Sequence, residues 1–146
     1  MARELACSKD NGDGTYQLTG DTGSPRYMAP EVAQCKPYNE RCDCYSFAIL
    51  IWQILEMSTP FDGYTVAMFS KKVVEAGHRP KCDEKWPPAI HDLLKTGWGP
   101  LARRPSMTEM ADILKNEINR VSDTEVFEIV DLSRKSEMSM HAAKYA

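Results

Sequence analysis

The stretch between Glu40 and Met57 constrains the fold more than any other part of this 146-residue chain. Its apolar side chains fall on nearly every face of a helix, and they are Tyr45, Phe47, Ala48, Ile49, Leu50, Ile51, Trp52, Ile54 and Leu55. A helix that is apolar all round lies buried at the centre of a domain. The apolar run is interrupted by Gln53 and is far too short to span a bilayer, so no membrane segment is expected. The sequence therefore predicts a mainly α-helical domain built around one buried central helix.

Shorter helices are predicted after this pattern. Pro30 and Pro87 can each open a helix, because proline is tolerated at the first helical position. Thr65 can cap another helix, and Gly77 can stop it. We expect helices over residues 30–33, 65–76, 87–97 and 105–118, the last with apolar residues at a spacing of three and four.

The ends of the chain differ in composition from this helical part. Residues 1–29 are polar, carry the turn signal Asn11-Gly12-Asp13-Gly14 and are expected to form a loop. Residues 119–146 form a polar tail that we expect to be partly disordered, with a short apolar patch at 126–130. We therefore expect three parts: a loop at 1–29, a helical domain at 30–118 and a tail at 119–146.

Composition narrows the class of protein. Hydrophobic residues make up 42% and charged residues 27%, which is typical of a globular domain. The net charge of −3 gives no basic excess for binding nucleic acid. The first residues contain no apolar core of a secretory signal, and five cysteines is an odd number, so reduced thiols in the cytoplasm or nucleus are expected. Cys42 and Cys44 are two residues apart and point to different faces of a helix, so we expect no metal site.

Four short motifs follow one another along the chain. In order they are Gly23-Ser24-Pro25-Arg26-Tyr27-Met28-Ala29-Pro30-Glu31, Asp43-Cys44-Tyr45-Ser46-Phe47, Arg79-Pro80, and Trp98 followed by Arg104-Pro105. In this order, with helices of suitable length between them, they resemble the large, C-terminal lobe of a protein kinase domain. The resemblance covers about residues 2–118 and is closest to the tyrosine-kinase-like group of Ser/Thr kinases.

The resemblance implies structural roles for three charged residues. Glu31 of the Ala29-Pro30-Glu31 closure is expected to pair with Arg104 inside the lobe, with Arg103 as the alternative partner. The other possibility for Glu31 and Arg104 is two exposed charges. Asp43 in this family holds the catalytic loop in place, whereas its simplest role is to stabilise a helix N-terminus.

The resemblance also assigns functions to the loop before this closure. Ser24, Pro25, Arg26 and Tyr27 align with the substrate-docking loop, and Ser24 favours Ser/Thr substrates, although it can also be an ordinary turn serine. Residues Thr19 and Thr22 are the candidate sites of phosphorylation by an upstream kinase or by the protein itself.

The parts of a kinase that carry the chemistry are not found in this sequence. It contains no Gly-rich loop, no His-Arg-Asp and no Asp-Phe-Gly, and it begins Met1-Ala2-Arg3, which resembles the residues just after Asp-Phe-Gly. We therefore expect no catalytic residue in this chain and no activity of the chain alone. ATP and Mg²⁺ would belong to an intact parent, cytoplasmic or on the intracellular face of a membrane, whose partners are protein substrates and whose N-terminal kinase half is missing here.

Two other interpretations stay open. A half-kinase can act as a scaffold or decoy that binds proteins through residues 24–26 and the helix at 65–76. The chain can also be an unrelated helical interaction domain whose motifs match by chance.

Overall fold

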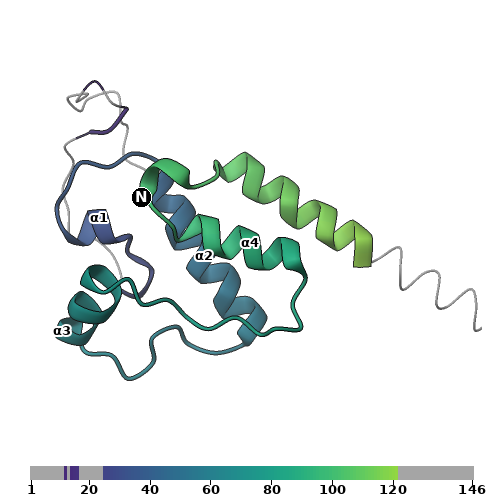
Figure 1. Cartoon of the computed structure of the whole chain (residues 1–146), viewed down its shortest axis with the longest axis horizontal. Helices are drawn as coiled ribbons and strands as arrows, with labels where there is room; N and C mark the ends of the chain where they lie inside the picture. The colour runs from purple at the N-terminus through teal and green to yellow at the C-terminus, as the bar shows by residue number, and fades with distance from the viewer. Residues whose placement is uncertain (1–11, 13, 17–24, 122–146) are drawn as a thin grey trace, which may run out of the picture. The chain divides into compact units, whose positions relative to one another are not determined.

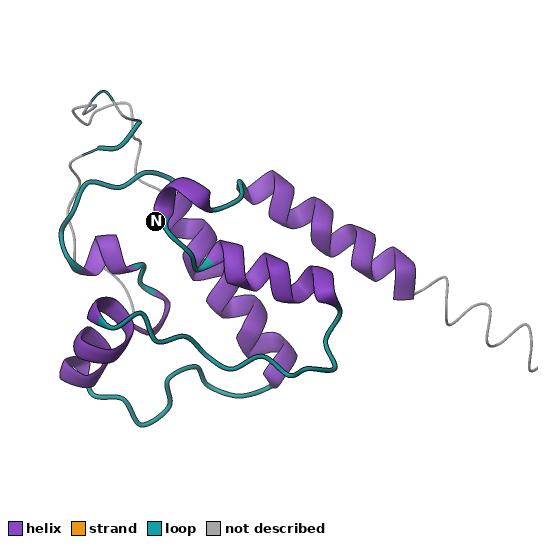
Figure 2. Cartoon of the chain, in the orientation of Figure 1, coloured by secondary structure: helices purple, strands orange, loops and turns teal. Residues whose placement is uncertain are grey.

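The computed structural model describes residues 12, 14–16 and 25–121 of the chain (Figure 1). The chain forms two compact units, Met1–Met110 and Ala111–Ala146. Among the described residues there are helices and loops but no strand (Figure 2). One isolated antiparallel bridge joins Tyr16 to Tyr38, whose backbone N–H and C=O groups pair at 2.9 and 3.2 Å. The mainly α class predicted from the sequence is confirmed.

The first unit is a set of short helices around one long one. Its elements are η2 (Pro25–Tyr27), α1 (Pro30–Ala33), α2 (Arg41–Glu56), α3 (Val66–Phe69), η3 (Ser70–Glu75), α4 (Pro88–Gly97) and η4 (Leu101–Arg103). Helix α4 packs on α2 and crosses it, while η2 contacts both α2 and α3 (Figure 1). The 3₁₀ helix η2 therefore lies against both the central helix and α3.

Helix α2 is buried along one side only. Its buried residues are Cys44, Tyr45, Ala48, Ile49, Ile51 and Trp52. Leu50, Ile54 and Leu55 are exposed, by 41%, 59% and 41%. The helix ends at Glu56, and the next residue, Met57, adopts a left-handed conformation with φ of 54°. The sequence predicted a helix buried on all sides, but only one face of α2 is buried. The C-terminal part of the helix exposes apolar side chains.

Gly97 sets the distance between α4 and α2. A Cβ atom placed on Gly97 would lie 2.8 Å from the Cβ of Ala48 and 3.3 Å from the Cε of Met110. No real Cβ fits at the shorter distance, because the Ala48 methyl group is fixed to the backbone of α2. The small residues at these two positions therefore allow the close packing that buries Leu93 and Leu94.

The helix expected over residues 65–76 is α-helical only in its first part. Thr65 caps α3, its Oγ1 accepting a hydrogen bond from the Met68 N–H at 3.2 Å, as the sequence predicts. From Ser70 to Glu75 the helix is π-helical, and the Ala76 N–H donates to the Lys71 carbonyl five residues back. A π turn contains one extra residue, and such turns often occur at functional sites.

The last predicted helix begins later than expected. Pro105 lies before it, and Ser106 caps it, its Oγ accepting a hydrogen bond from the Glu109 N–H at 3.3 Å. In return, the Ser106 N–H and hydroxyl donate to Glu109 Oε2 at 2.7 and 2.8 Å. These bonds lower the pKa of Glu109, chiefly the one from the backbone N–H. In the second unit, residues 111–121 are helical and carry the ion pairs Lys115–Asp112 and Arg120–Glu117. No helix in the described ranges is long and apolar enough to cross a membrane.

Candidate functional site

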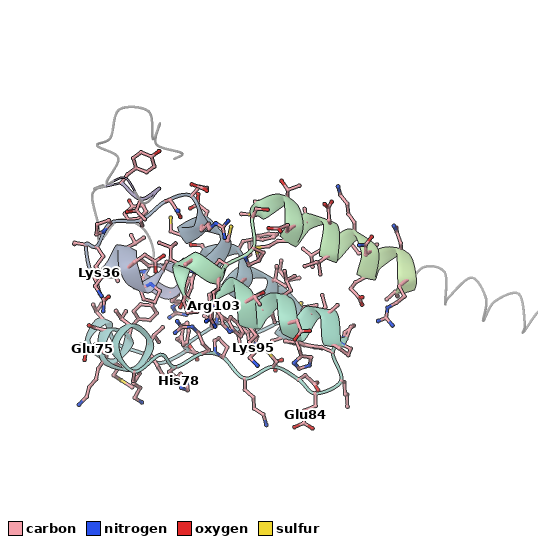
Figure 3. All side chains as sticks on the ribbon, turned by 45° about the horizontal axis from the view of Figure 1, so that its top comes forward. Lys36, Glu75, His78, Glu84, Lys95 and Arg103 are labelled. Atoms are coloured by element: carbon pink, nitrogen blue, oxygen red, sulfur yellow. The ribbon has the colours of Figure 1, made fainter. Side chains whose placement is uncertain are left out.

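A buried ion pair joins α1 to the loop after α4. The Arg104 Nη1 lies 2.6 Å from Glu31 Oε1, and its Nη2 donates to Glu31 Oε2 at 2.9 Å. The Arg104 side chain is 2% exposed and that of Glu31 12% exposed. Arg103, the alternative partner, is exposed and is labelled in Figure 3. The pair is bidentate, which is the geometry that a guanidinium and a carboxylate form most favourably.

Arg104 also hydrogen-bonds to the backbone of two other segments. Its Nε donates to the Gly99 carbonyl at 2.9 Å, and its Nη1 donates to the Arg41 carbonyl at 3.1 Å. Arg41 returns the contact, donating from its own Nη1 to the Arg104 carbonyl. One side chain thus holds together α1, the start of α2 and the segment that leads to Pro105.

Two guanidinium groups lie close to the ring of Tyr45. The Cζ atoms of Arg79 and Arg104 each lie 5.1 Å from its centroid. Arg79 also donates to the Trp98 and Val73 carbonyls, at 3.2 and 3.0 Å. Burial raises the pKa of Tyr45 and lowers that of Arg79. The phenol therefore stays neutral, and the Arg79 of the third motif and the Trp98 of the fourth meet in one cluster.

The 3₁₀ helix η2 is fixed to the central helix by two hydrogen bonds. The Tyr27 hydroxyl donates to Gln53 Oε1 at 2.5 Å, and the Ser46 hydroxyl donates to the Tyr27 carbonyl at 2.8 Å. The following residues, Met28 and Ala29, are buried, whereas Pro25 is exposed and Arg26 half-buried. Residues 25–29 are therefore anchored on α2 through Tyr27, while Pro25 and part of Arg26 are exposed to solvent.

Asp43 lies exposed in the first turn of α2. The Cys42 thiol donates a weak hydrogen bond to Asp43 Oδ1 at 3.8 Å. Burial, and then the charges of Asp43 and Glu31, raise the pKa of Cys42 to about 12. Cys42 is therefore a protonated, unreactive thiol at neutral pH.

Several of the residues predicted from the sequence lie outside the described part of the chain. One contact in the described part was not predicted. Ser24, Thr19 and Thr22 fall outside the described residues. In the part that the structure describes, no group of three or more His, Cys, Asp or Glu side chains is placed to hold a metal ion. The bond from Tyr27 to Gln53 was not predicted. The available signal was that Gln53 is polar within an apolar run, and a polar side chain in such a place needs a partner.

Comparison with known proteins agrees with this arrangement. Residues 2–114 match the family of protein tyrosine and serine/threonine kinases. The chain therefore belongs to this protein kinase family. The matched residues include the Glu31–Arg104 ion pair, η2 and the central helix α2. The family match therefore covers the part of the chain in which the site lies.

Relatives occur in plants, animals and amoebae. The serine/threonine-protein kinase STY17 of Arabidopsis thaliana is 37% identical over 109 residues, which is 74% of this chain and 19% of that protein. Mitogen-activated protein kinase kinase kinase 7 of Drosophila melanogaster is 33% identical over 103 residues, 70% of this chain and 15% of that protein. The dual specificity protein kinase shkB of Dictyostelium discoideum is 34% identical over 102 residues, 68% of this chain and 16% of that protein. The chain spans about a fifth or less of each of these relatives.

Proposed function

We propose that this chain is the substrate-positioning part of a protein kinase large lobe, and that a complete domain containing it transfers the γ-phosphate of ATP to Ser or Thr of proteins. The observation that supports this most is the double anchoring of one short segment. Tyr27 is bonded to α2, and Glu31, four residues on, is bonded to Arg104. Catalysis of phosphoryl transfer depends largely on positioning, which such an anchored segment supplies.

Each residue of the segment has a proposed task. Pro25 and Arg26 contact the substrate, and Ser24 places its hydroxyl near the catalytic aspartate of the complete domain. Phosphate on Thr19 or Thr22 orders the loop by pairing with arginines. The Glu31–Arg104 pair holds the segment in register with the helices behind it.

ATP and Mg²⁺ do not fit the residues of this chain. The sequence has no Gly-rich loop, His-Arg-Asp or Asp-Phe-Gly, and among the described residues no group of three or more His, Cys, Asp or Glu side chains is placed to hold a metal ion. We propose that the 146-residue chain alone transfers no phosphate and that sequence outside it supplies these groups. An intracellular site, where ATP is available and cysteines stay reduced, suits such a protein.

Two proteins test this proposal. The first is the 146-residue chain. The second is the product of the reading frame extended upstream of Met1. With labelled ATP and Mg²⁺, we expect no transfer by the first and transfer to Ser or Thr of a general protein substrate by the second. Labelled phosphate transferred by the 146-residue chain would contradict the proposal, and so would an extended frame without Asp-Phe-Gly.

A protein-binding scaffold is the second candidate function. The observation in its favour is that hydrogen bonds between residues of this chain, from Tyr27 to Gln53 and from Ser46 to the Tyr27 carbonyl, fix η2 to α2. A scaffold would bind substrate proteins without any upstream sequence and would inhibit an active kinase with the same substrates. Failure to compete with such a kinase would remove this candidate.

A further inference from the structure

The helix of the second unit, residues 111–121, carries an apolar stripe along one side (Figure 1). Ile118 is 64% exposed and Val121 is 49% exposed, while Leu114 of the same helix is half-buried. Residues at a spacing of three and four lie on one side of a helix, so these three side chains form a continuous stripe. A helix with such a stripe normally buries it against another part of a protein. We therefore looked for a segment that fits this surface.

Positive charges flank the apolar stripe. In a helix of about 3.6 residues per turn, Lys115 and Arg120 lie on opposite sides of the stripe. Their side chains are 74% and 61% exposed, and each forms an ion pair within the helix, Lys115 with Asp112 and Arg120 with Glu117. Exposed pairs of this kind contribute little to stability, so both cations can also pair with another segment. A segment with an apolar face and a carboxylate on each side of it would fit this surface.

Residues 125–132 of the same chain have this complementary pattern in their sequence, although they lie outside the described residues. Their apolar residues at a spacing of three and four are Val126, Ile129 and Val130. On a helix these three would share one face, with Glu125 and Asp131 on opposite sides of it. Both the apolar face and the signs of the flanking charges therefore match the stripe.

The connection between the two segments has the length and composition of a helix–helix turn. Only Ser122, Asp123 and Thr124 separate Val121 from Glu125. Two antiparallel helices are typically joined by two to five residues, roughly the length available here. Thr124 can cap a helix that begins at Glu125, and a carboxylate in the first turn is favourable there.

The antiparallel arrangement also places the charges correctly. With a connection of three residues and the same rise per residue in both helices, Asp131 comes level with Lys115. Glu125 comes level with the end of the first helix, near Arg120. In antiparallel helices that face each other, each of these carboxylates falls on the same side of the stripe as the cation beside it.

We propose that residues 125–132 fold back as a helix onto the stripe of Leu114, Ile118 and Val121 and form a helical hairpin at the end of the kinase lobe. A second copy of the chain or another protein could also cover the stripe. A segment tethered through three residues has an effective concentration of the order of millimolar, which favours the chain's own segment over both. This inference does not depend on phosphoryl transfer.

Nuclear Overhauser effects between methyl groups test the contact directly in the full 146-residue chain. We expect them between Ile118 or Val121 on one side and Ile129 or Val130 on the other. A mixture of isotope-labelled and unlabelled chains shows whether the contact is made within one chain or between two. We expect it within one chain.

Hydrogen exchange of the amides of residues 115–121 measures how firmly the segment docks. Ile129→Asp should speed this exchange by about tenfold or more, because the variant places a charge in the apolar face. Met138→Asp is the matched control, since it adds the same charge to a residue after the segment, and it should leave the exchange unchanged. Tryptophan fluorescence should be the same in both variants, because Trp52 and Trp98 belong to the first unit.

A charge reversal tests the predicted orientation. Asp131→Lys should speed the exchange by about twofold, the effect of one exposed ion pair, and Lys115→Asp in the same chain should restore it.

Each outcome supports or overturns the hairpin. Absence of the methyl effects would overturn it, and so would equal exchange in Ile129→Asp and Met138→Asp. Methyl effects only between labelled and unlabelled chains would show that a second copy covers the stripe, which also overturns the proposal. Failure of Lys115→Asp to restore the exchange in Asp131→Lys would overturn the antiparallel arrangement.

Discussion

Removing the buried ion pair should destabilise the first unit strongly. The pair joins Glu31 to Arg104, whose side chain is 2% exposed, through two bonds of 2.6 and 2.9 Å. In Glu31→Ala the guanidinium keeps its bonds to the Gly99 and Arg41 carbonyls but loses its only buried counter-charge among the described residues. Removing one partner of such a pair typically costs about 3–5 kcal/mol. We expect a loss of about 3 kcal/mol, because the two carbonyls still satisfy part of the guanidinium.

A double-mutant cycle isolates the pair from its surroundings. Glu31→Ala, Arg104→Ala and the double variant should give a coupling free energy of at least about 2 kcal/mol, because the double variant leaves no unpaired buried charge. Urea unfolding followed by tryptophan fluorescence measures each free energy, since Trp52 and Trp98 are buried, at 7% and 8% exposure. The slope of the unfolding free energy against urea concentration should be the same for all variants if they unfold from the same compact state.

A surface ion pair in the same chain serves as the control. Glu117 and Arg120 lie 2.8 Å apart, but the Arg120 side chain is 61% exposed. Their cycle should give about 0.3–0.5 kcal/mol and should weaken in high salt, whereas the coupling of the buried pair should change little. A coupling of the Glu31–Arg104 pair below about 1 kcal/mol in folded variants would refute the argument from burial.

Three further predictions concern packing, a carboxylate and a thiol. Gly97→Ala should destabilise the chain by about 1–3 kcal/mol despite the better helix propensity of alanine, because the new Cβ would lie 2.8 Å from the Cβ of Ala48. Adding Ala48→Gly to this variant should partly restore its stability, as measured by urea unfolding. A Gly97→Ala variant that is more stable than the unchanged chain would contradict the packing argument. The hydrogen bonds that lower the pKa of Glu109 in the folded chain stabilise it. This stabilisation is fully present above the ordinary glutamate pKa and is lost as the pH falls through the lowered pKa of the folded chain. Glu109→Gln should therefore flatten the dependence of stability on acid pH, and an unchanged profile would count against this contribution. Cys42, with a pKa of about 12, should react with iodoacetamide far more slowly than exposed Cys35 at mildly alkaline pH, as mass spectrometry of the labelled protein can show; equal rates would show that Cys42 is not held protonated.

The helices could be predicted because their signals are local. The apolar run of α2, the prolines at the start of α1 and α4 and the cap at Thr65 each act within a few residues, and the first residues of these four helices differ from the predicted ones by at most one position. The π-helical turn Ser70–Glu75 could not be predicted, because its sequence fits an α-helix equally well. Within this turn Val73 is completely buried, a tertiary contact that the local sequence does not reveal.

The candidate site was predictable only where a motif names both partners. Glu31 and Arg104 are 73 residues apart, and the family resemblance suggested their pairing. The structure shows the Arg104 Nη1 within hydrogen-bond distance of Glu31 Oε1. No short motif pairs Tyr27 with Gln53, or Arg79 with Tyr45, whose ring centroid lies 5.1 Å from the Arg79 Cζ. They depend on how η2 and the loop after η3 lie against α2, which local sequence patterns do not encode.

Phosphoryl transfer by the 146-residue chain, compared with the product of its upstream-extended reading frame, tests the central claim most directly. We expect no labelled phosphate on substrate with the chain alone, and transfer to Ser or Thr with the extended protein that is lost in Glu31→Ala. Transfer by the chain alone would contradict it. So would an extended protein that folds, contains Asp-Phe-Gly and keeps full activity without the Glu31–Arg104 pair.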